Sequence, residues 1–109
     1  MRSISLSSLS APRRQLLRWT RNMSFGWIEG LQVRDGEPVI HPAPKRIREV
    51  KLQGECVPIL SPAEMEMPLR EPEMELLRYF DQVQSVTIER LLVKYSMPFK
   101  ADAMEPESN

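Results

Sequence analysis

The side chains able to do chemistry are few, and they form no recognised catalytic or metal-binding pattern. Cys56 and His41 are the single cysteine and the single histidine of the 109-residue chain. A nucleophilic cysteine needs a basic partner in space, and a proline-rich connection and an expected strand separate these two residues. One cysteine, one histidine and scattered acids also lack the spacing of metal ligands. Cys56 is therefore expected to be a packed or bystander thiol.

Glu29 is the one carboxylate that strand alternation places beside apolar neighbours. It shares a strand face with Trp27, Leu31 and Val33, where burial could perturb its ionisation. The simpler interpretation is an edge-exposed glutamate or one that pairs with a nearby arginine. We expect no enzyme, no catalytic residue, no metal and no cofactor.

Charge is balanced in total but not in position. Fifteen basic and fifteen acidic side chains cancel, so no overall field would hold the protein on nucleic acid. Residues 1–28 nevertheless carry five arginines and no acid, whereas residues 61–82 carry six acids against two arginines. Any binding of anions must come from a local patch.

The basic stretch is expected to hold an amphipathic helix over residues 12–23. Ser10 and Pro12 are typical of a helix start, and Leu16, Trp19, Thr20 and Met23 recur at helical spacing. The opposite face then carries Arg14, Arg18 and Arg21. Three interpretations of these arginines stay open: a solvated face that touches the domain's own acidic helix, a contact with an anion, nucleic acid or membrane, or an extension outside the domain. Such an extension would be a transit peptide or an upstream translation start.

The clearest local signal is a β-hairpin that turns at Asp35-Gly36. Residues 25–33 read as a strand, Asp35-Gly36 as a type I′ turn and residues 37–41 as the return strand. This turn pairs Arg34 with Glu37, Val33 with Pro38 and Leu31 with Ile40. We expect a buried face made of Trp27, Leu31, Val33 and Ile40. Pro38 lacks an N–H, so its strand should lie at a sheet edge or end at once.

The rest of the chain predicts further elements of the same two kinds. They are a strand over 47–52, a loop over 54–67, a helix that opens at Glu71-Pro72-Glu73, a strand over 85–95, and a return strand from Pro98-Phe99 after a turn at Ser96-Met97. No internal repeat is expected. The fold class is α+β with a largely antiparallel sheet: a disordered tail over 1–10, one domain over 11–100 in which 11–24 could be separable, and an acidic disordered tail over 101–109.

One segment carries a resemblance to known sequences. Residues 25–39, Phe-Gly-Trp-Ile-Glu-Gly-Leu-Gln-Val-Arg-Asp-Gly-Glu-Pro-Val, with Arg46 to Leu52, Arg90 to Tyr95 and Met97-Pro98-Phe99, resemble a group of short bacterial proteins abundant in planctomycete-like genomes. The resemblance implies a bacterial domain and transfers no activity. Ser96 stands where the group's pattern leads us to expect glycine in the second turn.

These observations predict a non-enzymatic interaction module, soluble and cytoplasmic, that binds a protein partner or itself. The single cysteine fits a reducing compartment, and no apolar run is long enough to cross a bilayer. The candidate partner-binding residues are Arg14, Arg18, Arg21, Trp27 and Pro38. The alternative is weak nucleic-acid or anion binding through the arginine face, and a small enzyme ranks last.

Overall fold

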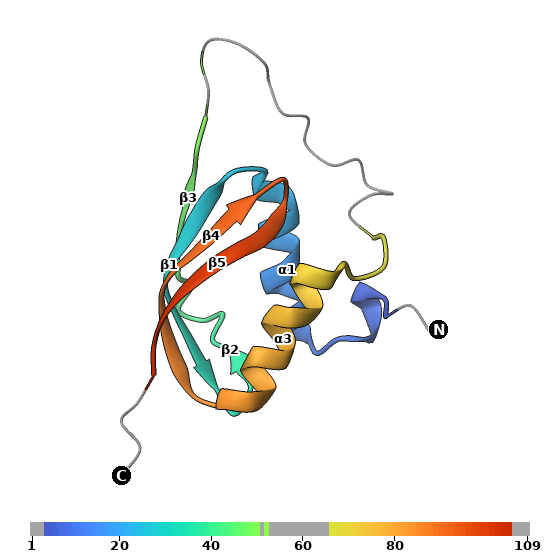
Figure 1. The fold of residues 1–109 in the computed structure, drawn as a ribbon, viewed down its shortest axis with the longest axis vertical. Helices are drawn as coiled ribbons and strands as arrows, with labels where there is room; N and C mark the ends of the chain where they lie inside the picture. Colours follow the sequence, from blue (N-terminus) through green and yellow to red (C-terminus); the bar gives the residue numbers. More distant parts are fainter. Residues whose placement is uncertain (1–3, 51, 53–65, 106–109) are drawn as a thin grey trace.

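Two helices cover one face of an antiparallel sheet, as Figure 1 shows. The computed structural model describes residues 4–50, 52 and 66–105. Its elements are η1 (Leu6–Ser8), α1 (Ala11–Met23), β1 (Gly26–Arg34), β2 (Glu37–Pro38), β3 (Lys45–Arg48), α3 (Glu71–Val83), β4 (Val86–Lys94) and β5 (Met97–Met104). The predicted α+β class is confirmed: a compact single domain with an N-terminal helix, a hairpin, a second helix and a C-terminal hairpin.

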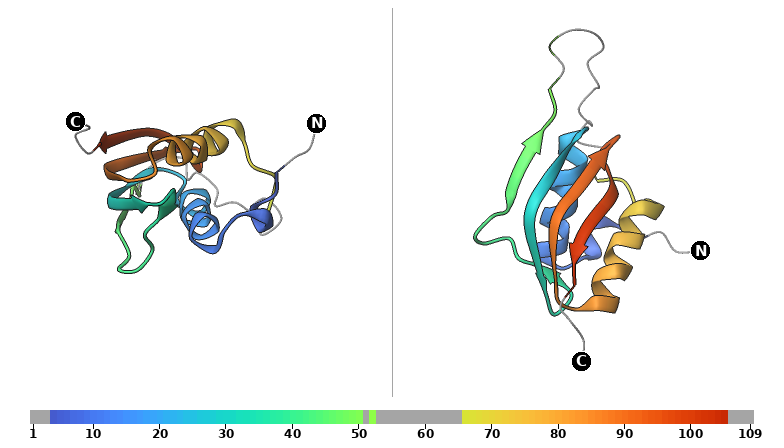
Figure 2. Two further views of the ribbon diagram at one scale, coloured as in Figure 1. Left: turned by 90° about the horizontal axis from the view of Figure 1, so that it is seen from below. Right: turned by 60° about the vertical axis from the view of Figure 1, so that its left-hand side comes forward.

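The sheet has the strand order β2-β1-β4-β5, and β3 pairs with the first half of β1 on the side of β2. One edge is therefore shared by β2 and β3, and the other edge is β5. The views in Figure 2 show α1 and α3 on the same side of this sheet. The predicted pairs Arg34 with Glu37 and Val33 with Pro38 are confirmed, and β2 ends at Pro38 on an edge as expected. It therefore stops short of Ile40, which the expected hairpin paired with Leu31.

The buried face of β1 differs from simple alternation. Ile28, Leu31 and Val33 are buried in the core, and Trp27 points to the opposite face with Glu29. The inward positions change from even to odd numbers around Gly30, whose φ of 69° lies in the left-handed region that glycine tolerates. Such an irregularity reverses the face of every later side chain. The predicted burial of Trp27 beside Leu31 is therefore wrong.

The chain contains an internal duplication, so the expectation of no repeat is wrong. Helix, long strand, two-residue turn and return strand recur at an offset of 60 residues: α1, β1 and β2 correspond to α3, β4 and β5. Both helices have 13 residues and both long strands have nine. The identical residues of the first unit are Pro12, Leu16, Leu17, Arg18, Ile28, Glu29, Leu31, Val33 and Pro38, which recur as residues 72, 76, 77, 78, 88, 89, 91, 93 and 98.

The two αββ units are related by a pseudo-twofold axis through the middle of the β1–β4 pair. Gly26 lies opposite Val93 and Val33 lies opposite Val86, two pairs that an exchange of the units converts into each other. Hydrogen bonds outside the sheet show the same pseudo-twofold symmetry. Gly36 donates its N–H to the Gln84 carbonyl at 2.8 Å, and Ser96 donates to the Ser24 carbonyl at 3.0 Å. Each unit thus anchors the turn of the other.

Two ion pairs join the helices, and their equivalent positions in the two units carry opposite charges. Arg13 of α1 bonds Asp81 of α3 at 2.5 Å, and Arg21 of α1 bonds Glu73 of α3 at 2.8 Å. Positions 13 and 73 are equivalent, as are 21 and 81. Helix α1 therefore supplies both cations and α3 both anions, which gives part of the basic and acidic stretches of the sequence a structural role.

Both expected tails contribute described structure. Leu6 of η1 is fully buried in the core, although residues 1–10 were expected to be a disordered tail. Strand β5 continues to Met104, beyond the expected domain end at residue 100. The second turn lies at Tyr95-Ser96, one residue earlier than predicted, and β3 spans Lys45–Arg48 in place of 47–52. Most of the expected loop over 54–67 lies outside the described residues.

Candidate protein-binding groove

The three predicted arginines of the first helix do not form one exposed face. Arg21 is fully buried: its guanidinium contacts both carboxylate oxygens of Glu73, and the carbonyl oxygens of Met67 and Pro68 accept from it. Arg18 is exposed and pairs with Glu66 at 3.4 Å, and Arg14 is half-buried. The placement of Arg21 on an outer cationic face is wrong, because α3 packs beside α1 and Arg21 faces Glu73 of that second helix.

The remaining predicted candidates are dispersed. Trp27 is half-buried and donates its indole N–H to Glu29 at 2.9 Å, so Glu29 has the structural role of an acceptor. Pro38 is buried at the β2 edge. His41 is exposed in the connection after β2, and Cys56 lies outside the described residues. Among the described residues there is no cluster of three potential metal ligands and no helix able to span a membrane.

A second group of arginines lies beside the end of α1. Arg46 stacks over the Trp19 ring at 4.4 Å, and Arg48 donates to the Asn22 carbonyl at 3.0 Å. These residues line a shallow hollow of about 220 Å³. Sequence reasoning missed this group because β3 lies far from α1 along the chain, and only the pairing of β3 with β1 brings it there.

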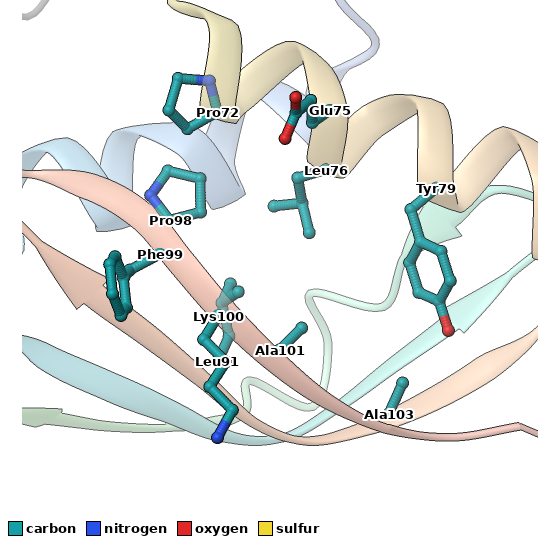
Figure 3. A pocket seen from close by; sticks show the side chains of 10 residues that line it. All are labelled: Pro72, Glu75, Leu76, Tyr79, Leu91, Pro98, Phe99, Lys100, Ala101 and Ala103. Atoms are coloured by element: carbon teal, nitrogen blue, oxygen red, sulfur yellow. The ribbon is translucent and has the colours of Figure 1, made fainter.

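An open, mostly apolar groove lies between α3 and β5. A groove of about 490 Å³ runs along the outer side of α3. Leu76 and Tyr79 form its helix wall, and Ala101, Ala103 and Phe99 come from β5 (Figure 3). The two alanines keep the floor low, because a methyl group projects little from the strand. Phe99 is 61% exposed and Met104 is 59% exposed.

The start of β5 is bonded to a charged network that includes the buried Arg21–Glu73 ion pair. Glu73 caps α3 by accepting the Arg70 N–H at 2.9 Å, and the Arg70 guanidinium donates to the Ser96 carbonyl at 2.8 Å. Burial by itself raises the pKa of Glu73, but hydrogen bonds from Arg21 and Arg70 outweigh it and hold that pKa below its ordinary value. Helix α3 and the start of β5 are therefore fixed relative to each other.

Tyr79, which lines the groove, contacts Glu105 after the end of β5. The Tyr79 hydroxyl donates to the Glu105 carboxylate at 2.7 Å, just beyond the end of β5. Loss of the hydroxyl proton would place two negative charges together. Burial and this hydrogen bond raise the pKa of Tyr79 to about 12.

This contact predicts a late tyrosine titration. The near-ultraviolet absorbance of tyrosinate should include a transition near pH 12, above the ordinary pKa of 10.0. Because the folded-state pKa is raised, the contribution of Tyr79 to stability is complete below its ordinary pKa and disappears as the pH rises through the folded-state value. Glu105→Gln should shift the transition part of the way back, and Tyr79→Phe should remove it. A transition unchanged by Glu105→Gln would contradict the role of this hydrogen bond.

Comparisons of the chain with protein-family models, with curated proteins and with solved structures find no match. The groove itself could have been anticipated in part. The residues Leu76, Leu77, Phe80 and Val83 predict a buried helix stripe, which includes Leu76 of the groove but not Tyr79. The continuation of β5 through Ala101 and Ala103 was interpreted as tail. Small residues with intervening charges give a weak strand signal.

Proposed function

We propose that this protein is a non-enzymatic binding module that takes up an extended segment of a partner protein along β5. The observation that carries the proposal is an eight-residue edge strand beside the α3–β5 groove. A sheet edge presents backbone N–H and C=O groups that an added strand can bond, and addition of a strand to such an edge is a recurrent mode of peptide recognition.

The outer side of β5 is available for this pairing. In the described part of the chain, β4 is the one strand that pairs with β5. Pro98 takes one N–H from the ladder near the start of the strand, and the six residues that follow, 99–104, retain theirs. Two exposed apolar side chains, Phe99 and Met104, belong to this edge strand. Burial of such side chains against a partner is favourable in free energy.

The groove defines the chemistry of the partner. Side chains of an added strand alternate between the two faces of the sheet, so every second side chain of the partner would enter the space between Tyr79, Leu76 and the two alanines. That space accepts aliphatic or aromatic groups. The intervening side chains would face Lys100 and Asp102 on the open side of the sheet, where polar groups are favoured. We therefore expect an extended segment with alternating apolar and polar residues.

A peptide titration tests this function. Fluorescein-labelled short peptides with valine or leucine at alternate positions should bind, and amide chemical shifts should change in β5 and α3. Ala101→Phe fills the floor of the groove and should weaken binding about tenfold, which is ~1.4 kcal/mol. Ala43→Phe, an exposed alanine near the opposite edge, is the matched control and should leave binding unchanged. Peptides that perturb other surfaces, or equal losses in both variants, would refute the proposal.

Anion binding through arginines is the second candidate, and it now depends on other residues. Arg13 and Arg21 form ion pairs with α3 and Arg18 pairs with Glu66, whereas Arg46 and Arg48 lie beside Trp19 at the end of α1. Salt-sensitive binding of short single-stranded oligonucleotides that Arg46→Gln reduces and Ala101→Phe leaves intact would favour this function.

A further inference from the structure

We infer that the segment taken up by β5 is β5 of a second copy of this chain, in an antiparallel register centred on Ala101. This inference rests on the proposed strand addition at β5 and names its partner. The reason is that the exposed edge is self-complementary in charge and size.

Charge complementarity selects the register. When Ala101 lies opposite Ala101 of the second copy, Lys100 lies opposite Asp102 of the second copy, and the symmetric pair forms as well. Shifting the register by two residues in either direction puts Lys100 opposite Lys100 or Asp102 opposite Asp102. Unlike charges directly opposite on neighbouring strands stabilise a sheet, and like charges destabilise it.

The existing sheet already contains the row that this dimer would extend. Lys45, Glu29, Arg90 and Asp102 are consecutive partners across β3, β1, β4 and β5, so their charges alternate in sign along the open face. The next member of the row would be Lys100 of the second copy, which continues the alternation. Lys100 and Asp102 also lie 3.7 Å apart within one chain, and the amino group of Lys100 points away from α3 (Figure 3).

Size complementarity follows the same register. Phe99, which an irregularity leaves without a partner on β4, falls opposite Ala103 of the second copy, so a large side chain meets a small one at two symmetric places. Pairing would cover the exposed Phe99 ring next to the groove. The dimer axis makes this interface isologous, because each surface contacts an identical one.

The fold already contains one antiparallel junction between two αββ units. The two αββ units of one chain are joined by the antiparallel β1–β4 pair, with α1 and α3 on one side of the sheet. Glu29 lies opposite Arg90 beside the pseudo-twofold axis. A second junction at β5 would repeat this arrangement, with Lys100 and Asp102 in the place of Glu29 and Arg90.

Charge-reversal variants test the dimer. Sedimentation equilibrium of the full chain should show a concentration-dependent dimer. Lys100→Asp and Asp102→Lys should each raise its dissociation constant at least about tenfold, and the double variant should restore it. Mixing the two single variants should give a one-to-one heterodimer, a result that a folding defect cannot produce. Glu89→Lys, an exposed reversal on the neighbouring strand, is the control.

The outcomes separate this inference from the proposed function. A wild-type protein that stays monomeric at every concentration overturns the second-copy inference, and so does a dimer that neither single reversal weakens. If that monomer still binds alternating peptides at β5, strand addition stands and the partner is another protein. If it binds none there, both proposals fall.

Discussion

Replacing Glu73 by glutamine is expected to lower the free energy of unfolding by about 3–5 kcal/mol, because it removes the negative charge that the buried Arg21 guanidinium contacts. Both side chains are 0% exposed. Glutamine keeps the size of the side chain and one of its two oxygens, so the substitution opens no cavity. The loss of stability therefore measures the contribution of charge and hydrogen bonding. Urea unfolding followed by circular dichroism measures it.

The matched control for this change is Glu66→Gln. Glu66 also accepts from an arginine of α1, Arg18, but the two side chains are 55% and 44% exposed. Exposed pairs contribute about 0–1 kcal/mol, so the control should unfold close to the wild type. A loss in Glu73→Gln no larger than in Glu66→Gln would show that Arg21 finds other compensation.

Replacing Leu6 by alanine should destabilise the fold by roughly 2–5 kcal/mol, the usual range for a fully buried leucine. Leu6 belongs to the core although it stands in a serine-rich segment that resembles a tail. The segment is tied to the rest of the domain at its start, where the Ile4 carbonyl accepts the Leu69 N–H at 2.8 Å. Thermal and urea unfolding of the two proteins would give the difference.

Ile4→Ala is the control for the Leu6 change. The Ile4 side chain is 43% exposed, and its backbone hydrogen bond survives the substitution. Its effect should stay within about 0.5 kcal/mol, as is typical of surface positions. Equal and small effects at both positions would mean that the segment carrying η1 separates from the core at little cost.

Local signals predicted most elements of this fold. The capped helix predicted over 12–23, the Asp35-Gly36 turn and the helix that opens at Glu71 each depend on contacts between near neighbours, which a single sequence displays. The placement of Trp27 failed because one left-handed glycine inside β1 changes the face of all later residues. The prediction that Leu6 lies in a disordered tail failed because the burial of an isolated leucine depends on elements that are distant in the sequence.

The duplication was visible in principle and was missed. Leu-Leu-Arg followed by an aromatic residue occurs at 16–19 and at 76–79, and Ile-Glu-x-Leu-x-Val occurs at 28–33 and again at 88–93. Most other equivalent positions carry different residues, including the ion-paired positions. The basic first unit and the acidic second unit therefore do not look like copies of one sequence. The candidate groove required the structure, since it depends on β5 lying next to α3 and on the absence of bulky side chains at two alanines.

The opposite charges at equivalent positions of the two helices affect how copies of this chain pair with one another during folding. Two first units brought together would set Arg13 against Arg21, and two second units would set Glu73 against Asp81, so pairing of like units is opposed by charge. A first unit of one molecule nevertheless fits the second unit of another as well as its own. The charges thus select pairs of unlike units, but they do not select units of the same chain. We therefore expect domain swapping, the exchange of one unit between two molecules, to be the main assembly error of this fold.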